Sequence, residues 1–179
     1  MEKKKLEWKK LKESKIRAGH HRILVNKTFR LPDGRVAEYE ILKRLGIVCI
    51  FALTPKNRVI LVRQYRPGAE MVLDEMPGGN MDEGETPMRA AKRELLEETG
   101  YTGKIKLVGW SFDDDAYAET RRYHLIATNC KKVAEPKPDK NEFLEVVEVS
   151  LGEFRKHLKS RKLTDVKVGY LCLDFLNLL

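Results

Sequence analysis

The chain of 179 residues is 42% hydrophobic and 35% charged, and its 35 Lys and Arg against 27 Asp and Glu give a formal net charge of +8. This composition excludes a disordered or fibrous chain and predicts one globular domain over residues 1–179. The longest apolar run, residues 45–53, is too short to span a bilayer, so no membrane partner is expected. The positive charge favours anionic partners, but no nucleic-acid-binding signature accompanies it, and no nucleic acid partner is predicted.

The N-terminal segment has basic residues but no apolar stretch behind them, unlike a secretory signal. Three cysteines, an odd number without metal-ligand spacing, are present: Cys49, Cys130 and Cys172. We expect them to be reduced structural residues. These features together predict a cytoplasmic location.

The first predicted elements are short strands separated by turns. Strand-like runs occupy residues 23–31, 36–42, 46–53 and 59–66, with turns at "PDGR" and "TPKNR" between them. The run at 46–53 is apolar throughout, which predicts a strand covered on both faces and therefore helices on both sides of a sheet.

A helix is predicted over about residues 87–99. Thr86 suits the N-cap, Pro87 the first helical position and Gly100 the position after the last turn. Apolar residues recur at helical spacing and are expected to face the core: Met88, Ala91 and Leu95.

The rest of the chain continues the alternation. Strands are predicted at 103–110, 121–128 and 143–150, with a Pro- and Lys-containing connector at 131–141. Two helices follow. The first has a capping box at Ser150 and Glu153, and the second begins near Asp165. One side of the second helix is expected to carry Val168, Leu171, Phe175 and Leu178. The predicted fold class is an α/β (α+β) sandwich, with a mixed β-sheet packed between helices.

The helix at 87–99 carries an unusual concentration of negative charge. Glu94, Glu97 and Glu98 share one face at 100° per residue, and like charges at this spacing destabilise a helix. Arg93 can pair with Glu97 and relieve part of the repulsion. A glycine-rich turn precedes the helix, and its backbone can approach that face closely. Clustered carboxylates and free carbonyl oxygens are ligands suited to Mg²⁺ or Mn²⁺.

The same stretch resembles the Nudix box, G-x5-E-x7-R-E-U-x-E-E-x-G-U with U apolar. All nine specified positions match: Gly79, Glu85, Arg93, Glu94, Leu95, Glu97, Glu98, Gly100 and Tyr101, the last being the loosest fit. The resemblance implies a Nudix fold and a hydrolase that cleaves a diphosphate linked to another group, with Mg²⁺ or Mn²⁺ as cofactor. It further implies metal ligation by Glu94, Glu98 and the Gly78 carbonyl, with Glu97 as a further ligand or a water-orienting group. Glu85 and Arg93 would orient the turn and the helix.

The segment before the box, "VILVRQYRPGAEMVLDEMPGG" at 59–79, resembles the ADP-ribose and nucleoside-diphosphate-sugar pyrophosphatase branch of this family. By that resemblance Arg66, and second Arg63, would contact a small-molecule nucleotide diphosphate substrate. Glu142 is matched to a glutamate that assists the attacking water, with Glu145 as the alternative. Glu119 is a further candidate for substrate contact.

One position departs from that branch. Its members usually carry a proline 16 residues past the box, and here Tyr117 stands there, as in dinucleoside-polyphosphate hydrolases. The leading prediction is an ADP-ribose or related nucleotide-sugar pyrophosphatase that releases a nucleoside monophosphate and a sugar phosphate. Two alternatives stay open: a dinucleoside-polyphosphate or modified-nucleotide hydrolase, and a nucleotide-binding regulator without turnover. Asp113–Asp115, in the same loop, are expected to face solvent.

The resemblance also implies a division of the single domain. Strands within about residues 1–44 resemble the part that pairs two subunits in this branch, and about 45–179 would form the catalytic core. A homodimer is therefore expected by resemblance only.

Overall fold

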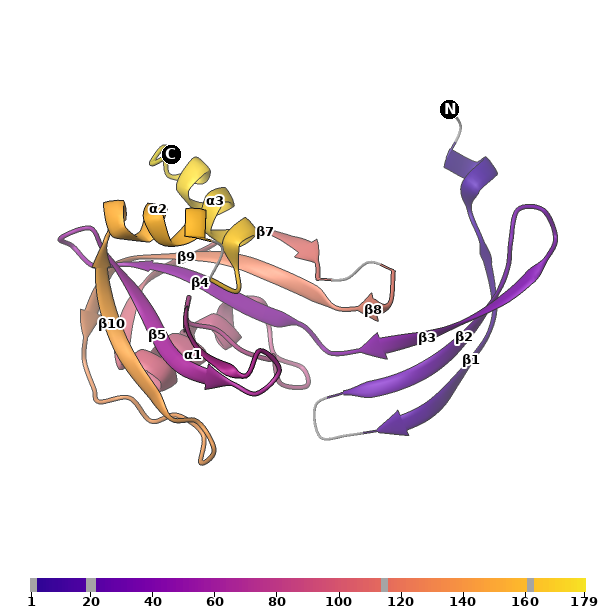
Figure 1. Ribbon diagram of the computed structural model, residues 1–179, viewed down its shortest axis with the longest axis horizontal. Helices are drawn as coiled ribbons and strands as arrows, with labels where there is room; N and C mark the ends of the chain where they lie inside the picture. Colours follow the sequence, from indigo (N-terminus) through magenta and orange to yellow (C-terminus); the bar gives the residue numbers. More distant parts are fainter. Residues whose placement is uncertain (1–2, 19–21, 114–115, 161–162) are drawn as a thin grey trace. The chain divides into compact units, whose positions relative to one another are not determined.

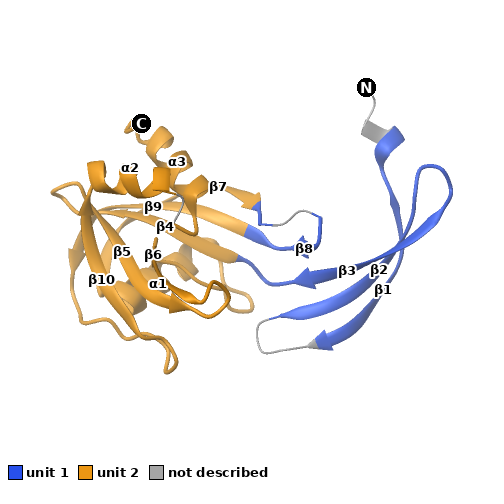
Figure 2. Ribbon diagram, viewed as in Figure 1, with its two compact units in different colours: residues 1–46, 112–121 blue, residues 47–111, 122–179 orange. Residues whose placement is uncertain are grey.

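The computed structural model describes residues 3–18, 22–113, 116–160 and 163–179. The chain forms two compact units, which Figures 1 and 2 show in the same orientation. Unit 1 comprises residues 1–46 and 112–121, and unit 2 comprises 47–111 and 122–179.

Unit 1 contains a short 3₁₀ helix, η1 (Lys3–Leu6), and a four-stranded sheet in the order β1-β2-β3-β8. Its strands are β1 (Lys9–Ala18), β2 (Ile23–Arg30), β3 (Val36–Lys43) and β8 (Ala118–Glu119). The first three are antiparallel, and β8 is parallel to β3. The predicted β2 and β3 are confirmed. Strand β1 was not predicted, because its lysines obscure the apolar alternation.

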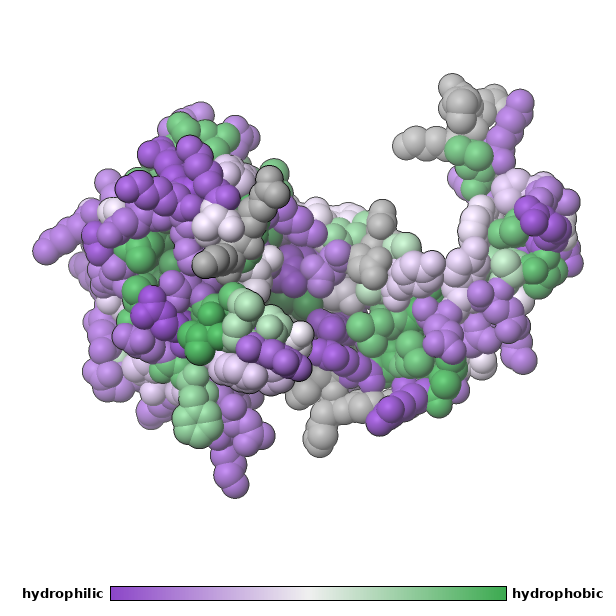
Figure 3. All heavy atoms as spheres, in the orientation of Figure 1, coloured by the Kyte–Doolittle hydropathy of each residue, from purple (hydrophilic) through white to green (hydrophobic). Residues whose placement is uncertain are grey.

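Apolar side chains gather on the visible face of unit 1 (Figure 3). The rings of Trp8, Phe29 and Tyr39 pack together, with centroids 5.5 to 6.2 Å apart. They line a cavity of about 430 Å³ that also contacts Tyr117 and Glu119. Trp8 remains 46% exposed and Tyr117 58% exposed, so this aromatic surface is open to solvent.

Unit 2 is built on a six-stranded mixed sheet in the order β10-β5-β4-β9-β7, with β6 paired to β5. The strands are β4 (Ile47–Leu53), β5 (Arg58–Arg66), β6 (Met71–Glu75), β7 (Tyr101–Phe112), β9 (Arg121–Lys132) and β10 (Leu144–Ser150). Strand β4 is parallel to β9 and antiparallel to β5. All seven residues of β4 are buried, which confirms a strand covered on both faces.

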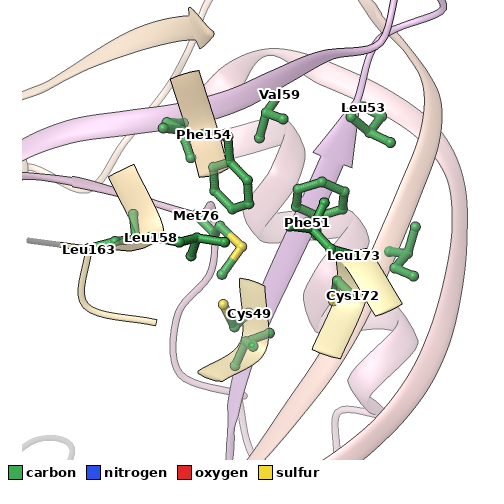
Figure 4. Close-up of a cluster of buried hydrophobic side chains, with 13 residues drawn as sticks. Cys49, Phe51, Leu53, Val59, Met76, Phe154, Leu158, Leu163, Cys172 and Leu173 are labelled. Atoms are coloured by element: carbon green, nitrogen blue, oxygen red, sulfur yellow. The ribbon is translucent and has the colours of Figure 1, made fainter. Parts of the chain in front are cut away.

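Helices cover both faces of this sheet (Figure 1). Helix α1 (Pro87–Thr99) packs Ala90, Ala91 and Leu95 against Val48 and Ile50 of β4. Helices α2 (Leu151–Ser160) and α3 (Val166–Phe175) pack on the opposite face. There Phe154 meets Phe51 with ring centroids 5.1 Å apart (Figure 4). The mixed sheet between helices confirms the predicted fold class.

The ends of the helices follow the local signals. Thr86 accepts a hydrogen bond from Arg89 N at 3.4 Å, and Gly100 ends α1 in the left-handed conformation at φ 73°. At α2, Ser150 N donates to Glu153 Oε2 at 2.7 Å, and Glu153 N donates to Ser150 Oγ at 3.2 Å. The predicted bounds of α1 and the capping box of α2 are confirmed.

The predicted apolar stripe of α3 is wrong in part, because Leu171 and Phe175 are 45% and 42% exposed. The buried residues of α3 are Val168, Gly169, Cys172 and Leu173. A Cβ at residue 169 would lie 2.5 Å from Leu158 Cδ2, so the glycine lets α2 approach this face. The apolar side chains on α3 lie on several sides, and packing against α2 selects the buried one.

The three cysteines are free and buried, as predicted. Within the described residues, no helix is both long and apolar enough to cross a membrane.

Candidate active site

The buried apolar side of helix α1 determines where its acidic residues lie. Ala91 and Leu95 are fully buried under the sheet, which fixes the rotation of the helix about its axis. Glu98 is then 4% exposed, whereas the side chain of Glu97 is 46% exposed. The three carboxylates that share one face in the sequence therefore have different environments.

The glycine turn lies directly against these carboxylates. Gly78 N donates to Glu98 Oε2 at 2.8 Å. The neighbouring carbonyls, of Pro77 and Gly79, accept from Ile50 N and Val48 N at 2.9 Å each. Gly78 therefore lies between two residues whose carbonyls bond to β4, and its own N–H is directed at Glu98.

Both glycines of the turn are required by close contacts. A Cβ at residue 78 would lie 2.1 Å from Val48 O, and one at residue 79 would lie 2.6 Å from Glu94 Oε1. Glu94 thus occupies the space that a side chain at residue 79 would fill. The turn and the acidic helix are packed as one unit.

Arg93 offsets part of the repulsion between the carboxylates on the helix. Its Nη1 donates to Glu94 Oε1 at 2.8 Å and to Glu97 Oε2 at 3.2 Å. On the other side it donates to both oxygens of Glu85, at 2.9 and 3.1 Å. The hydrogen bond with Arg93 lowers the pKa of Glu85. Arg93 therefore joins the helix to the turn, in agreement with the orienting role that the resemblance implies.

The buried carboxylates hold their protons more tightly than free ones. Burial raises the pKa of Glu94 to about 7, although the Arg93 hydrogen bond opposes the shift. Burial raises the pKa of Glu98 to about 8, against the hydrogen bond from Gly78. The charge of Glu142 raises the pKa of both residues, so Glu142 lies within electrostatic reach of each.

Among the described residues, no three His, Cys, Asp or Glu side chains are gathered closely enough to form a ready metal cluster. Glu94 and Glu97 are turned to Arg93, and Glu98 to the Gly78 N–H. The donor set nevertheless fits a hard divalent cation, since it offers carboxylate oxygens beside the backbone of a glycine turn. Two of these carboxylates carry raised pKa values, which is the electrostatic condition that a cation would relieve.

Arg66 is held beside this face by a buried carboxylate. Its Nε donates to Glu75 Oε2 at 2.6 Å, and Gln64 Nε2 donates to the same oxygen at 3.0 Å. The Arg66 charge lowers the pKa of Glu98, which places the guanidinium near the acidic helix. No role was predicted for Gln64 or Glu75, although both stand in the "QYR" and "E-x-PGG" segments that resemble the pyrophosphatase branch.

Arg63 is engaged differently. It lies opposite Asp74 on β6 and opposite Glu145 on β10 in the strand register. Its guanidinium donates twice to Asp74, at 2.7 and 3.2 Å, and lies 3.6 Å from Glu145. The two candidates Arg63 and Glu145 therefore form part of a ladder of charges across three strands.

Glu142 belongs to a turn after the connector between β9 and β10. Glu142 N donates to Asp139 O at 2.8 Å, and Asp139 N donates to Glu142 Oε2 at 3.2 Å. Glu142 is half-buried, whereas the side chain of Glu145 is 68% exposed. The charge of Glu142 raises the pKa of both Glu94 and Glu98, which favours Glu142 over Glu145.

The remaining candidate, Glu119, lies in unit 1. It forms an ion pair with Lys27 and lies 3.7 Å from Lys43. Nearby, Tyr117 O accepts from Leu42 N at 2.8 Å, and Asp113 N donates to Thr120 O at 3.3 Å. Asp114 and Asp115 lie outside the described residues.

The fold is an α/β sandwich in which one helix presents a face of glutamates beside a glycine turn. The family model of the NUDIX domain matches residues 42–167, and the chain belongs to the Nudix family. It is 33% identical to ADP-ribose pyrophosphatase of Bacillus subtilis (strain 168), a match that covers 93% of this chain and 91% of that protein. It is 32% identical to methanol dehydrogenase activator of Bacillus methanolicus, over 92% of this chain and 90% of that protein.

Two further comparisons agree with the family. ADP-sugar pyrophosphatase of Mus musculus is 35% identical, over 73% of this chain and 68% of its own length. A crystal structure of an ADP compounds hydrolase superposes with a TM-score of 0.80 at 20% identity, covering 95% of this chain and 94% of that one. The superposition shows that the two proteins share a fold.

Proposed function

We propose that this protein hydrolyses the pyrophosphate bond of ADP-ribose or a related nucleoside-diphosphate sugar. The products would be a nucleoside monophosphate and a sugar phosphate. The observation that carries the proposal is the packing of Glu94 and Glu98 against the Gly78–Gly79 turn, with Glu142 within electrostatic reach of both and Arg66 within reach of Glu98. Relatives that match most of the chain and are named ADP-ribose and ADP-sugar pyrophosphatases support the substrate class.

Mg²⁺ or Mn²⁺ is the proposed cofactor, held by Glu94, Glu98 and the Gly78 carbonyl, with Glu97 as a further ligand or a water-orienting group. Such an ion supplies Lewis-acid stabilisation of the charge on the pyrophosphate. Arg66, oriented by Glu75, would bind a phosphate oxygen of the substrate. Arg63 is the second candidate for this contact, and Glu119 a candidate for contact with another part of the substrate.

Glu142 is the proposed general base, which takes a proton from the attacking water. Its Oε2 accepts from Asp139 N, and the second oxygen of the carboxylate can take the proton. We expect Glu142→Gln to lower kcat by about 10²-fold or more, which is typical of the loss of a general base. Glu145→Gln is the matched variant, and we expect it to change kcat little. A larger loss from Glu145→Gln would transfer the role to that residue.

The substrate is tested by incubating the pure protein and Mg²⁺ with ADP-ribose, nucleotide sugars, diadenosine polyphosphates and 8-oxo-dGTP, and then separating the products. The largest kcat/KM is expected for ADP-ribose or a nucleotide sugar. Preferential cleavage of a diadenosine polyphosphate or of 8-oxo-dGTP would favour the dinucleoside-polyphosphate or modified-nucleotide hydrolase instead.

A second candidate function is that of a regulator of another enzyme. The match to a relative named methanol dehydrogenase activator, over 92% of this chain, favours it. Absence of turnover with every compound in the panel, with binding of a nucleotide retained, would support this role over the pyrophosphatase.

A homodimer paired through the N-terminal strands and a cytoplasmic location complete the proposal. The exposed apolar side chains of unit 1 are compatible with pairing. Light scattering of the full chain tests the first point, and a monomeric mass at micromolar concentration would contradict it.

A further inference from the structure

The connector between β9 and β10 is attached to the end of the acidic helix. Val133 N and Ala134 N donate to Gly100 O at 2.8 and 3.2 Å, and Lys137 N donates to Glu97 O at 2.7 Å. The last carbonyls of a helix lack partners within the helix. The connector thus supplies a partner to Glu97, a residue of the acidic face itself.

Lys137 stands between Pro136 and Pro138. Prolines have no backbone N–H and a fixed φ, so Lys137 carries the only backbone donor of this tripeptide and lies in a stiff segment. That donor goes to Glu97 O, while the Lys137 side chain is exposed. The contact therefore depends on the backbone at residue 137 rather than on its side chain.

The segment that contains Glu142 is also fixed at its C-terminal end, where it enters β10. Leu144 begins β10 and pairs with Gln64 on β5, the residue that shares Glu75 with Arg66. Residues 138–143 thus span two fixed points, one on the acidic helix and one beside the Arg66 pair. Glu142 is on this span.

We propose that the backbone N–H of Lys137, held between two prolines, is a positioning group that sets the place of the Glu142 carboxylate relative to Glu94 and Glu98. The inference rests on the proposed role of Glu142 as general base. Misplacement of a reacting group by about 1 Å can lower a rate about 10²-fold, so the loss of one anchor is expected to be visible in kcat.

A pair of variants separates backbone from side chain. Lys137→Pro removes the N–H and places a ring against Glu97 O, while its backbone remains compatible with an extended segment between prolines. Lys137→Ala removes the side chain and keeps the N–H. With the substrate that the panel identifies, we expect Lys137→Pro to lower kcat about tenfold or more with KM changed less than about twofold. Lys137→Ala is expected to retain the wild-type kcat.

The Glu142→Gln background tests whether the anchor acts through Glu142. If it does, Lys137→Pro lowers kcat no further in that background. An equal loss in both backgrounds, an equal loss from Lys137→Ala, or a changed KM with unchanged kcat would overturn the inference. Glu142→Gln alone tests the proposed role of Glu142. Full activity of that variant would refute Glu142 as the general base, whatever the result at residue 137.

Two measurements cover the case in which Lys137→Pro does not fold. Pro138→Gly leaves the N–H in place but frees the backbone beside it, and we expect a smaller loss in kcat that also vanishes in the Glu142→Gln background. Hydrogen exchange of the wild-type protein should show a protected amide at Lys137. An amide that exchanges as fast as an unstructured one would contradict the anchor.

Discussion

The side chain of Glu94 lies where a Cβ of residue 79 would stand, at 2.6 Å from its Oε1. The carboxylate of Glu94 can therefore occupy its position only because residue 79, fifteen residues earlier in the chain, has no side chain. This contact explains in physical terms why the turn and the helix form one site, because neither can shift without displacing the other.

Substitution at this glycine gives a direct test. Gly79→Ala should displace Glu94 and lower kcat by about tenfold or more, since the carboxylate can no longer hold its position. Steady-state kinetics and thermal unfolding measure the effect. Gly68→Ala is the matched control, because nothing lies within 4 Å of a Cβ there and its φ is not in the left-handed region. Equal kinetics in Gly79→Ala and wild type would show that Glu94 can move without cost.

Glu98 offers a second test at the scale of one residue. Glu98→Gln keeps an oxygen that can accept from Gly78 N but removes the charge available to a cation. We expect activity to fall by about 10²-fold or more while circular dichroism and the melting temperature stay near those of the wild type. Glu83→Gln, at an exposed carboxylate of the preceding loop, is the control. Similar rates in both variants would refute the metal-site assignment.

At the scale of elements, strand register creates ion pairs that cannot be read from the sequence. Arg63 and Arg66 are three residues apart on β5, and both were predicted to contact the substrate. Register sets Arg63 opposite Asp74, whereas Arg66 reaches the buried Glu75. Because β6 was not predicted, neither partner could be assigned. The different states of the two arginines follow from the β5–β6 pairing.

The start of α2 was predicted from its capping box alone. Ser150→Ala removes the acceptor for Glu153 N, and we expect the free energy of unfolding to fall by about 1 kcal/mol. Chemical denaturation measures this change. Ser14→Ala, at an exposed serine of β1, should change the free energy of unfolding by less than about 0.5 kcal/mol. Equal stability of Ser150→Ala and wild type would mean that packing alone holds the start of α2.

At the scale of the whole molecule, unit 2 contains the acidic helix, the glycine turn, Arg66 and Glu142. Burial raises the pKa of Glu94 and of Glu98, so their charged forms are destabilised until a cation binds beside them. Added Mg²⁺ or Mn²⁺ should therefore raise the melting temperature by several degrees at concentrations about 100 times Kd, in line with about 2.7 kcal/mol of linkage.

The same measurement has an internal control. A double variant, Glu94→Gln with Glu98→Gln, should show no rise, and Glu83→Gln should behave as the wild type does. EDTA should reverse the rise and abolish turnover. An equal rise in the double variant would place the cation elsewhere.

The sequence by itself determined the bounds of α1, the capping box of α2 and the family. The N-cap, the proline at the first helical position and the terminal glycine defined α1 to the residue, because these signals act over a few positions. The spacing from Gly79 to Tyr101 indicated the family, which the match over residues 42–167 confirmed. Apolar periodicity was less decisive for α3, where several faces are apolar.

Only the tertiary structure decided which carboxylates are buried, which arginine faces them and which glutamate lies within reach. Glu94 and Glu98 acquire raised pKa values from burial, and burial depends on how α1 and the Gly78–Gly79 turn pack on β4. Glu142 lies 44 residues beyond Glu98 in the chain, yet its charge raises the pKa of both Glu94 and Glu98. Such long-range placements arise from strand register and close packing, which local sequence patterns do not encode.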